Sequence, residues 1–302
     1  MMGQTNAEIV RDKWNASMQQ RSEALHRKFS WHSPTVQRFI SAEYLGGLKS
    51  KEVLIQYLNG KPIERALDVG GGLGEQAKVF YDALHVEHFD VLDISDVAVS
   101  TGAKRAKKEG RNIHFAVADL NKEPLPDVEY DLICASGALH HIENLEFLFE
   151  QINSRLAPDG VFYANDYMGP SHMQWDDKQL ALMNAVVGIL PDELNRVQHR
   201  GNNIVSEVTR IPLEVFARVD PSEGVRSADI FDVMEKHLKI EKVVPFGQTL
   251  AYEVLRGRVQ NFDDNDAKDQ AILSLICLLE KELIDAGVIS SDFNFVIATK
   301  AA

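Results

Sequence analysis

The sequence has 302 residues, of which 45% are hydrophobic and 25% are charged, and its formal net charge at pH 7 is −13. This length and composition are typical of one enlarged globular domain, or of one domain with a cap. The acidic balance disfavours a general binder of nucleic acid or of anionic membranes, because such proteins normally carry the opposite charge.

Two features of the sequence indicate a cytoplasmic protein. The N-terminal stretch MMGQTNAEIVRDKWN is polar and lacks the apolar core of a signal peptide, and the longest apolar windows are too short to span a membrane. The two cysteines, Cys134 and Cys277, lie in apolar stretches, so we expect buried free thiols in a reducing compartment. The cysteine spacing does not suit a metal, and we expect none.

The sequence predicts helices over residues 1–60, followed by strands and helices in alternation. Apolar residues recur at three- and four-residue intervals through VQRFISAEYLGGLKSKEVLIQYL. Strands are then expected at RALDV, EHFDVLDI, NIHFAVADL, YDLICAS and GVFYAND, separated by helices at 74–84, 96–109 and 143–156. Fully apolar strands separated by helices indicate a parallel sheet that is covered on both faces.

The regular alternation stops after the fifth strand. Residues 167–235 contain helical segments and no strand-like run, so we expect a helical insertion over the active edge of the sheet. Strand character returns at LKIEKVVPF and, after a helix in DAKDQAILSLICLLEKELIDAG, at DFNFVIATK. The predicted division is an N-terminal helical cap at 1–60, an α/β core at 61–166, the insertion or lid at 167–235, and the rest of the core sheet at 236–302.

The stretch ALDVGGGLGEQA, residues 66–77, places a glycine-rich turn between the first strand and the next helix. Such a turn lets the backbone pass close to a ligand at the carboxyl ends of the strands. Dinucleotides and S-adenosylmethionine are the two ligand classes that use it. Gly72, Gly74 and Ala77 satisfy the dinucleotide pattern G-x-G-x-x-A, and Asp93 stands at the separation of a ribose-binding acid.

Asp68 favours S-adenosylmethionine over a dinucleotide. It ends the first strand two residues before Gly70, where its carboxylate would repel a pyrophosphate. The same carboxylate suits a ligand that bears an ammonium group, as the methionyl half of S-adenosylmethionine does. A nicotinamide-dependent oxidoreductase stays open as the alternative that explains the glycines and Asp93.

The pattern Asp68-x-Gly70-x-Gly72-x-Gly74 resembles motif I of the class I S-adenosylmethionine-dependent methyltransferases. The resemblance continues in register through VLDIS, VADL, YDLICASGALHHIEN and LAPDGVFYAND, over about residues 61–166. It implies a Rossmann-like α/β fold with a seven-stranded, mostly parallel sheet whose last strand is antiparallel. The cofactor would be S-adenosylmethionine and the product S-adenosylhomocysteine. The residues assigned to the cofactor are Asp68, Gly70, Gly72, Gly74, Asp93, Ile94, Asp119, Leu120 and Ser136.

Two of these residues have specific roles in the family that the sequence resembles. The resemblance places Asp93 on the ribose hydroxyls and Asp119 near the adenine amino group. Helix capping or a solvated turn is the competing explanation for each of the two aspartates. Ser136 equally has a competing role in the turn of the loop that it begins.

Methyl transfer to an alcohol needs a base, because the pKa of an alcohol is far above neutral. Candidate bases are expected where the fourth and fifth strands end, at His140 and His141 in GALHHIEN and at His172 in GPSHMQW. Packing or capping is the competing explanation for these histidines. The candidate acceptor-binding residues are Asp166, Tyr167 and Trp175.

Three further residues have two interpretations each. Trp31 either covers the cofactor or packs the N-terminal helices together. Arg218 and Arg226 flank VDPSEGV, and they either bind an anionic acceptor or pair with nearby acids. Those acids are Asp220, Glu223 and Asp229.

The expected function is transfer of a methyl group from S-adenosylmethionine to a small molecule. Oxygen is the first choice of acceptor atom, with a sugar or a secondary metabolite as the acceptor. A cyclase or regulatory role on the same fold is an alternative that intact cofactor motifs leave open. Nucleic-acid and membrane partners are not expected, whereas helical insertions of this kind are compatible with a homodimer.

Overall fold

The computed structural model describes residues 5–20, 29–197 and 200–301. Residues 1–4 and 21–28 of the expected N-terminal cap therefore lie outside the described residues. Among the described residues, no helix is long and apolar enough to cross a membrane. Cys134 and Cys277 are both buried and unpaired, as the sequence predicts.

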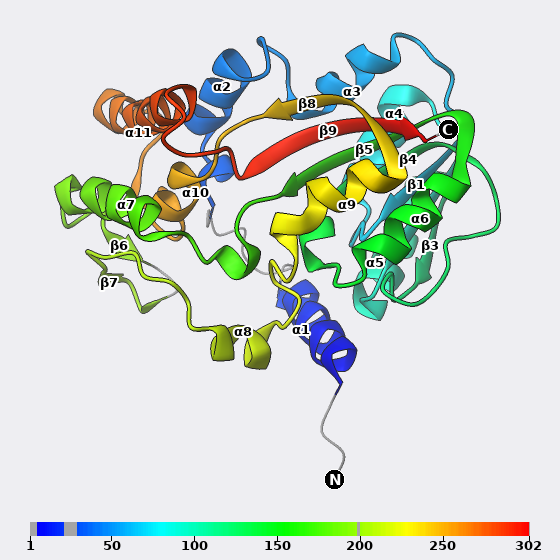
Figure 1. The fold of residues 1–302 in the computed structure, drawn as a ribbon, viewed down its shortest axis with the longest axis horizontal. Coiled ribbons are helices and arrows are strands. Elements are labelled where there is room, and N and C mark those ends of the chain that lie inside the picture. The colour runs from blue at the N-terminus through cyan, green and yellow to red at the C-terminus, as the bar shows by residue number, and fades with distance from the viewer. Residues whose placement is uncertain (1–4, 21–28, 198–199, 302) are drawn as a thin grey trace.

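The sheet contains seven strands in the order β3-β2-β1-β4-β5-β9-β8 (Figure 1). Their bounds are β1 (Arg65–Val69), β2 (His88–Asp93), β3 (Ile113–Val117), β4 (Tyr130–Ser136), β5 (Leu156–Tyr167), β8 (Leu238–Pro245) and β9 (Phe293–Lys300). Neighbouring strands from β3 to β5 pair in parallel, whereas β9 pairs antiparallel with both β5 and β8. The expected Rossmann-like sheet with an antiparallel last strand is confirmed.

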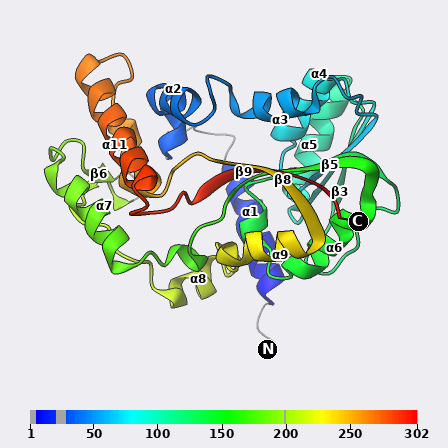
Figure 2. The ribbon, with the colours of Figure 1, turned by 45° about the horizontal axis from the view of Figure 1, so that its top comes forward.

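Alternate residues of β1 pack on opposite faces of the sheet, as the two-residue period of a strand requires. Ala66 belongs to a core that includes residues of α3 (Ser50–Leu58), α4 (Glu75–Leu84) and α5 (Asp96–Lys108). Leu67 belongs to a second core with residues of α6 (Leu145–Arg155) and α9 (Ile230–His237). The sheet is therefore covered on both faces (Figure 2).

A second group of helices lies beside the sheet, on the left in both ribbon views (Figures 1 and 2). It contains α7 (Asp177–Ile189), α10 (Leu250–Leu255) and α11 (Ala267–Asp285), and α2 (Pro34–Glu43) packs against α11. The buried carboxylate of Glu280 in α11 accepts hydrogen bonds from the amides of Gln248, Leu250 and Ala251, at 2.7–2.8 Å. These bonds satisfy the free amides at the start of α10 and fix it to α11.

This arrangement differs from the division expected from the sequence. Helix α9 packs on α6 and β8, so the end of the predicted insertion belongs to the core, whereas α10 and α11 join α7 in the helical group. The insertion also contains a short hairpin of β6 (Arg196–Val197) and β7 (Asn203–Ile204), although no strand was expected there. Strands of two residues are too short to show a periodic pattern.

Helix α1 (Asn6–Gln20) lies against α5 and is fastened there by one side chain. Asn15 accepts a hydrogen bond from Ser95 Oγ at 2.6 Å and donates one to Asp96 Oδ1 at 2.6 Å. Ser95 is the N-cap of α5, so α1 docks on the start of that helix. The remaining short elements are α8 (Leu213–Val219) and 3₁₀ turns at Ser30–His32, Leu139–His141, Ser171–Met173, Ser227–Asp229 and Val259–Asn261.

Candidate active site

A cavity of about 860 Å³ lies at the carboxyl ends of the parallel strands. This is the edge where open α/β sheets bind their ligands, and the volume is in the upper part of the usual range of about 300–1,000 Å³ for ligand pockets. Its lining combines the glycine turn after β1, the loops after β2, β3, β4 and β5, and part of α1. Aromatic residues near β9 and α10 complete the wall.

Packing within the protein requires glycine at two positions of the turn. Gly70 has φ +71°, and a Cβ there would lie 2.5 Å from the Cβ of Ala138. Gly74 has φ +75°, and a Cβ there would lie 2.5 Å from the ring of Phe115. Gly70 and Gly72 line the cavity, whereas Gly74 is not among the described residues that do so. Its place in the motif follows from close contact with the neighbouring strand β3.

Asp93 joins the glycine turn to the end of β2. Its carboxylate accepts hydrogen bonds from the amides of Gly72 and Ser95, both at 2.8 Å. Burial raises the pKa of Asp93, and the two amides oppose that rise. Asp93 and the following Ile94 both line the cavity. The carboxylate thus shapes the turn in addition to facing any ligand in the cavity.

Asp68 is fully buried at the end of β1 and borders the cavity. Neither of its carboxylate oxygens has a partner at hydrogen-bond geometry among the described residues, although the Cys134 thiol and the Ala77 amide are close enough to oppose the effect of burial on its pKa. Burial raises the pKa of this carboxyl group to about 7. A buried carboxylate is costly unless it is paired, and a ligand ammonium group in the cavity would supply the missing partner.

Asp119, after β3, caps a turn and also lines the cavity. Asp119 Oδ1 accepts a hydrogen bond from the amide of Asn121 at 3.1 Å, and Oδ2 pairs with Lys122 Nζ at 3.0 Å. The carboxylate therefore caps the turn that follows the strand. Asp119 also lines the cavity, as do Leu120 and Ser136. The individual contacts of these three residues with a cofactor stay predictions.

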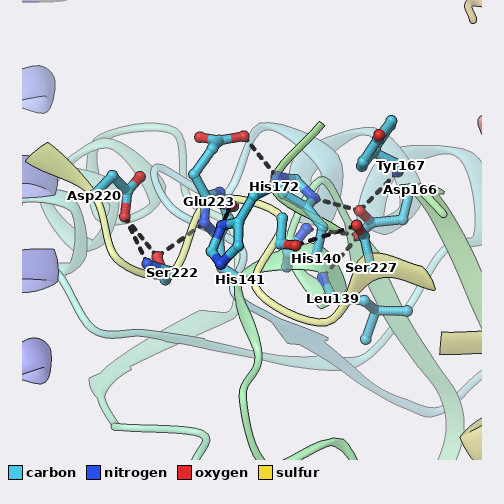
Figure 3. Close-up of polar contacts among 12 residues, drawn as sticks. Leu139, His140, His141, Asp166, Tyr167, His172, Asp220, Ser222, Glu223 and Ser227 are labelled. Atoms are coloured by element: carbon cyan, nitrogen blue, oxygen red, sulfur yellow. Dashed lines mark hydrogen bonds and ion pairs between the residues drawn. The ribbon is translucent and has the colours of Figure 1, made fainter. Parts of the chain in front are cut away.

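His140 is held by Asp166 at the ends of β4 and β5 (Figure 3). Asp166 Oδ1 lies 2.5 Å from His140 Nδ1 and also accepts a hydrogen bond from the amide of Tyr167 at 2.8 Å. Asp166 Oδ2 accepts hydrogen bonds from the amides of Ala138 and Leu139 at 2.7 and 2.8 Å. One buried carboxylate therefore orients the imidazole ring and also fixes the turn that carries it.

The charges around His140 determine its protonation. Burial alone lowers the pKa of His140, but the charge and hydrogen bond of Asp166 and the charge of Glu223 outweigh burial and raise it. Burial raises the pKa of Asp166, and His140 with the two turn amides brings it below its ordinary value. His140 Nε2 is left for the cavity, with Glu223 Oε1 at 3.7 Å.

His141 has a different environment from its neighbour. Its Nδ1 lies 3.0 Å from Ser222 Oγ, and Ser222 donates its own proton to Asp220 at 2.7 Å. The ring meets Trp14 of α1 edge-on, with centroids 5.3 Å apart. Burial and the adjacent charge of His140 hold the pKa of His141 well below its ordinary value. His141 lines the cavity as a neutral ring fixed by packing.

The remaining predicted site residues divide between the cavity and the protein interior. Tyr167 lines the cavity, and its hydroxyl donates to the carbonyl of Pro170 at 2.9 Å. Among the described residues, those lining the cavity do not include His172 or Trp175. His172 Nδ1 bonds to the backbone carbonyl of Glu223 at 2.8 Å, and the buried Trp175 donates to Asp292 at 3.1 Å. Each has a structural contact, and a role at the acceptor stays a prediction.

The two arginines of the insertion are not part of the cavity wall as the structure describes it. Arg226 pairs with both carboxylate oxygens of Glu146, at 2.7 and 2.9 Å, and with Asp229 at 2.8 Å. Asp229 is one of the acids expected from the sequence, whereas Glu146 comes from α6 and was not foreseen. Arg218 is exposed on α8. Neither arginine is therefore placed to bind an anionic acceptor.

Several cavity residues were not identified from the sequence as site residues. Glu223 reaches the cavity from the insertion, Trp14 from α1 and Tyr252 from α10. Trp31 stacks on Tyr252 with ring centroids 5.4 Å apart, and Tyr252 meets Phe293 at 5.3 Å. Trp31 therefore lines the cavity and packs against α10 and β9, and its contact with a cofactor stays a prediction.

Three potential metal ligands also meet here. Donor atoms of His140, His141 and Glu223 lie within 4.8 Å of one another, the one such group of three among the described residues. The sequence predicts no metal. Removal of metal ions from the protein distinguishes a metal site at these three residues from a metal-free site.

Residues 66–160 match the protein family described as the methyltransferase domain. This segment is a class I S-adenosylmethionine-dependent methyltransferase domain. The cofactor of the methyltransferase domain is S-adenosylmethionine, so the expected cofactor is confirmed, whereas the contact of Asp68 with it stays a prediction. The nicotinamide alternative for the glycine turn receives no support.

Curated relatives of the methyltransferase domain act on different acceptors. A segment of 135 residues is 33% identical to phosphoethanolamine N-methyltransferase 1 of Arabidopsis thaliana and covers 43% of this chain and 26% of that protein. A sterol 24-C-methyltransferase of Gibberella zeae is 32% identical over 112 residues, which are 36% of this chain and 29% of that protein. The chain thus spans between a quarter and a third of the length of these relatives.

Two solved structures share the fold over nearly the whole chain. Phosphoethanolamine N-methyltransferase 2 of Haemonchus contortus aligns with a TM-score of 0.54 and 14% identity, covering 99% of this chain and 61% of that one. Geranyl diphosphate C-methyltransferase of Streptomyces coelicolor aligns with a TM-score of 0.51 and 12% identity, covering 99% of both chains. At this identity the likeness shows the fold of the methyltransferase domain and its surrounding helices, and does not specify an acceptor.

Proposed function

We propose that the chain transfers the methyl group of S-adenosylmethionine to a hydroxyl group of a small molecule. The observation that carries this proposal is the pairing of His140 with Asp166 in the same cavity as the glycine turn. A sugar or a hydroxylated secondary metabolite is the first class of acceptor to test. The named relatives methylate nitrogen or carbon, so the acceptor atom has to be determined by experiment.

The residues around the glycine turn would hold the cofactor. Asp68, which lacks a partner at hydrogen-bond geometry among the described residues, would pair with the ammonium group of the methionyl half. Asp93 would accept hydrogen bonds from the ribose hydroxyls, and Asp119 would lie near the adenine amino group. When bound, S-adenosylmethionine supplies a methyl carbon that its sulfonium already activates for displacement.

His140 would act as the general base. Its neutral Nε2 accepts the proton of the acceptor hydroxyl while the oxygen forms its bond to the methyl carbon and the carbon–sulfur bond breaks. Asp166 keeps the proton on Nδ1 and stabilises the imidazolium that results. The products are the methyl ether, S-adenosylhomocysteine and a proton that His140 returns to water. Positioning of the acceptor in line with the methyl group supplies the rest of the acceleration.

The first experiment is calorimetric titration with S-adenosylmethionine and S-adenosylhomocysteine, with NADH as the control. Release of S-adenosylhomocysteine is then followed with a panel of hydroxylated acceptors. Binding of both adenosyl ligands, with release that depends on an acceptor, supports the proposal. Binding without release from any acceptor would favour the regulatory or cyclase alternative on the same fold.

A further inference from the structure

The cavity is strongly acidic. Among the described residues that line it, six carry a carboxylate, and Lys49 is the only lysine or arginine. The six are Asp68, Glu75, Asp93, Asp119, Asp166 and Glu223. Arg226, considered above as a ligand for an anionic acceptor, is not among the described residues that line the cavity, and Glu146 and Asp229 engage it. Beside Glu223, whose carboxylate lies beyond hydrogen-bond distance of both Lys13 and His140, a phosphate or carboxylate on the acceptor would therefore meet a like charge.

Most of these carboxylates already have a partner or an assigned ligand. Asp68, Asp93 and Asp119 lie in the half of the cavity that the cofactor would fill. Asp166 is bound to His140, and Glu75 pairs with Arg105 at 2.9 Å. Glu223 is the carboxylate that the insertion adds beside the general base. Glu223 is therefore the carboxylate of the cavity that is available to contact the acceptor.

The side chain of Glu223 is held only loosely by its neighbours (Figure 3). Oε1 lies 3.7 Å from His140 Nε2, and Oε2 lies 3.9 Å from Lys13 Nζ. Both distances exceed the length of a hydrogen bond, and Lys13 is itself paired with Asp220. The carboxylate is 26% exposed and can accept further hydrogen bonds from a molecule in the cavity.

The backbone of Glu223 is fixed independently of this side chain. Its carbonyl accepts a hydrogen bond from His172 Nδ1 at 2.8 Å, and the carbonyl of the following Gly224 accepts one from the amide of His172 at 2.7 Å. A change of the carboxylate to an amide would therefore leave the loop in place. His172 thus serves the site as a positioning residue for Glu223.

We infer that Glu223 selects the acceptor, by accepting a hydrogen bond from a donor group next to the reacting hydroxyl and by repelling anionic acceptors. This inference rests on the proposed function, because it takes His140 Nε2 as the point where the reacting hydroxyl sits. A donor on the neighbouring carbon then reaches Glu223 Oε1, which lies 3.7 Å from that nitrogen. The donor is a second hydroxyl or an ammonium group, and Trp31, Tyr252 and Phe293 offer aromatic faces to the acceptor's carbon skeleton.

The test compares matched acceptors on the full chain. A methyl glycoside, the corresponding amino sugar, the corresponding sugar monophosphate and the corresponding sugar bisphosphate are each assayed by release of S-adenosylhomocysteine. We expect turnover of the neutral or the amino compound and a kcat/KM at least about 10-fold lower for both phosphorylated compounds. The ratio of kcat/KM between the methyl glycoside and the amino sugar shows whether a hydroxyl or an ammonium group donates the hydrogen bond to Glu223. Equal use of the phosphorylated compounds would overturn the inference.

Substitution of Glu223 tests the residue itself. Glu223→Gln should raise KM for the preferred acceptor about 10-fold or more, the size expected for loss of a charge-assisted hydrogen bond, and should reduce discrimination against the sugar monophosphate. It should also move the pH midpoint of kcat/KM downward, because the charge of Glu223 helps to raise the pKa of His140. Glu214→Gln, on the exposed part of α8, is the control and should change neither quantity. An unchanged acceptor preference in Glu223→Gln would refute the assignment.

The proposed function and this inference fail separately. If no acceptor releases S-adenosylhomocysteine, the proposed function is wrong, and calorimetric binding of the same four compounds to the protein loaded with S-adenosylhomocysteine then tests the inference. If the phosphorylated compounds bind the unaltered protein more weakly than the other two compounds, and if Glu223→Gln reduces this difference, selection by charge would still be supported. Equal binding by both proteins would overturn it.

Discussion

The carboxylate of Asp166 binds the ring of His140 and the backbone of the turn that carries this ring. Orientation of the imidazole and formation of the turn are therefore parts of one arrangement, centred on the end of β5. The side chain of Asp166 is 0% exposed and that of His140 is 13% exposed, so a proton taken up on Nε2 is stabilised from the more buried side of the ring.

Replacement of His140 tests its role as the base. His140→Gln should lower kcat by about 10²- to 10⁴-fold, the usual contribution of general-base catalysis, and should leave the affinity for S-adenosylhomocysteine nearly unchanged. Steady-state kinetics and calorimetry give the two quantities. His114→Gln, on the exposed part of β3, is a matched control. A variant of His140 with full activity would remove this residue from the chemistry.

The pH dependence of turnover follows from the raised pKa of His140. The base must be neutral, so kcat/KM should rise with pH and level off above the pKa of His140 in the protein. That midpoint should lie above 6.5, the ordinary value for histidine, because Asp166 and Glu223 raise this pKa. A profile that is flat from acid to alkaline pH would show that proton removal by His140 does not limit the reaction.

Asp68 should make cofactor affinity depend on pH. Its pKa of about 7 in the free protein means that the carboxyl group is largely protonated below this pH, whereas an ammonium group binds the ionised form. The affinity for S-adenosylmethionine should therefore increase as pH rises through about 7. Calorimetric titrations below and above this pH provide the measurement. Asp68→Asn should bind more weakly and show little of this dependence.

The same shift predicts a change in stability of the free protein. The pKa of Asp68 is raised above its unfolded value, so the stability that its protonated form contributes is lost as pH rises through about 7. Asp292 is also buried with a pKa raised to about 7 and acts in the same direction. The free energy of unfolding of Asp68→Asn, measured by denaturation, should therefore still decrease as pH rises through about 7, but less than that of the unaltered protein. A steeper dependence than in the unaltered protein would contradict this account.

Asp93 should affect the cofactor through two contacts. Asp93→Ala removes the carboxylate expected to bind the ribose hydroxyls and also the acceptor for the amide of Gly72. A loss of about 10- to 100-fold in affinity for S-adenosylhomocysteine is expected for charge-assisted hydrogen bonds of this kind. Calorimetry checks it, with Asp90→Ala on the same strand as the comparison. Unchanged affinity in Asp93→Ala would remove this residue from the cofactor site.

Chelation tests the absence of a metal requirement. His140 serves as a base only if Nε2 is free, so treatment with EDTA followed by desalting should leave turnover unchanged. Loss of activity that zinc or manganese restores would instead assign His140, His141 and Glu223, whose donor atoms approach within 4.8 Å, to a metal ion. Elemental analysis of the purified protein gives an independent answer.

The sheet and the part of the cavity that lies at the strand ends could be predicted because their signals are local. Each strand is a short apolar run, and Asp68, Asp93 and Asp119 stand at strand ends that the topology brings to one edge. A resemblance over about 100 contiguous residues is enough to identify such a unit, because the strand, the turn and the ligand contact are close together in the sequence.

The acceptor half could not be predicted in the same way, because long-range packing places its residues. Tyr252 reaches the cavity from α10, whose first turn depends on the buried carboxylate of Glu280 in a helix that follows it in the sequence. Glu223 depends on a hydrogen bond between its carbonyl and the ring of His172. Neither relationship leaves a periodic pattern or a fixed spacing in the sequence.

Helix α1 forms part of the cavity wall, with Val10, Trp14 and Met18 in the lining, and Asn15 fastens it to the start of α5. Any ligand that contacts this wall binds more tightly when the helix is docked, so ligand binding and docking strengthen each other by mass action. Docking of α1 and binding of a ligand at this wall should therefore share one equilibrium: an occupied cavity should protect α1 from proteases, and removal of the residues of α1 that precede Asn15 should shorten the residence time of such a ligand.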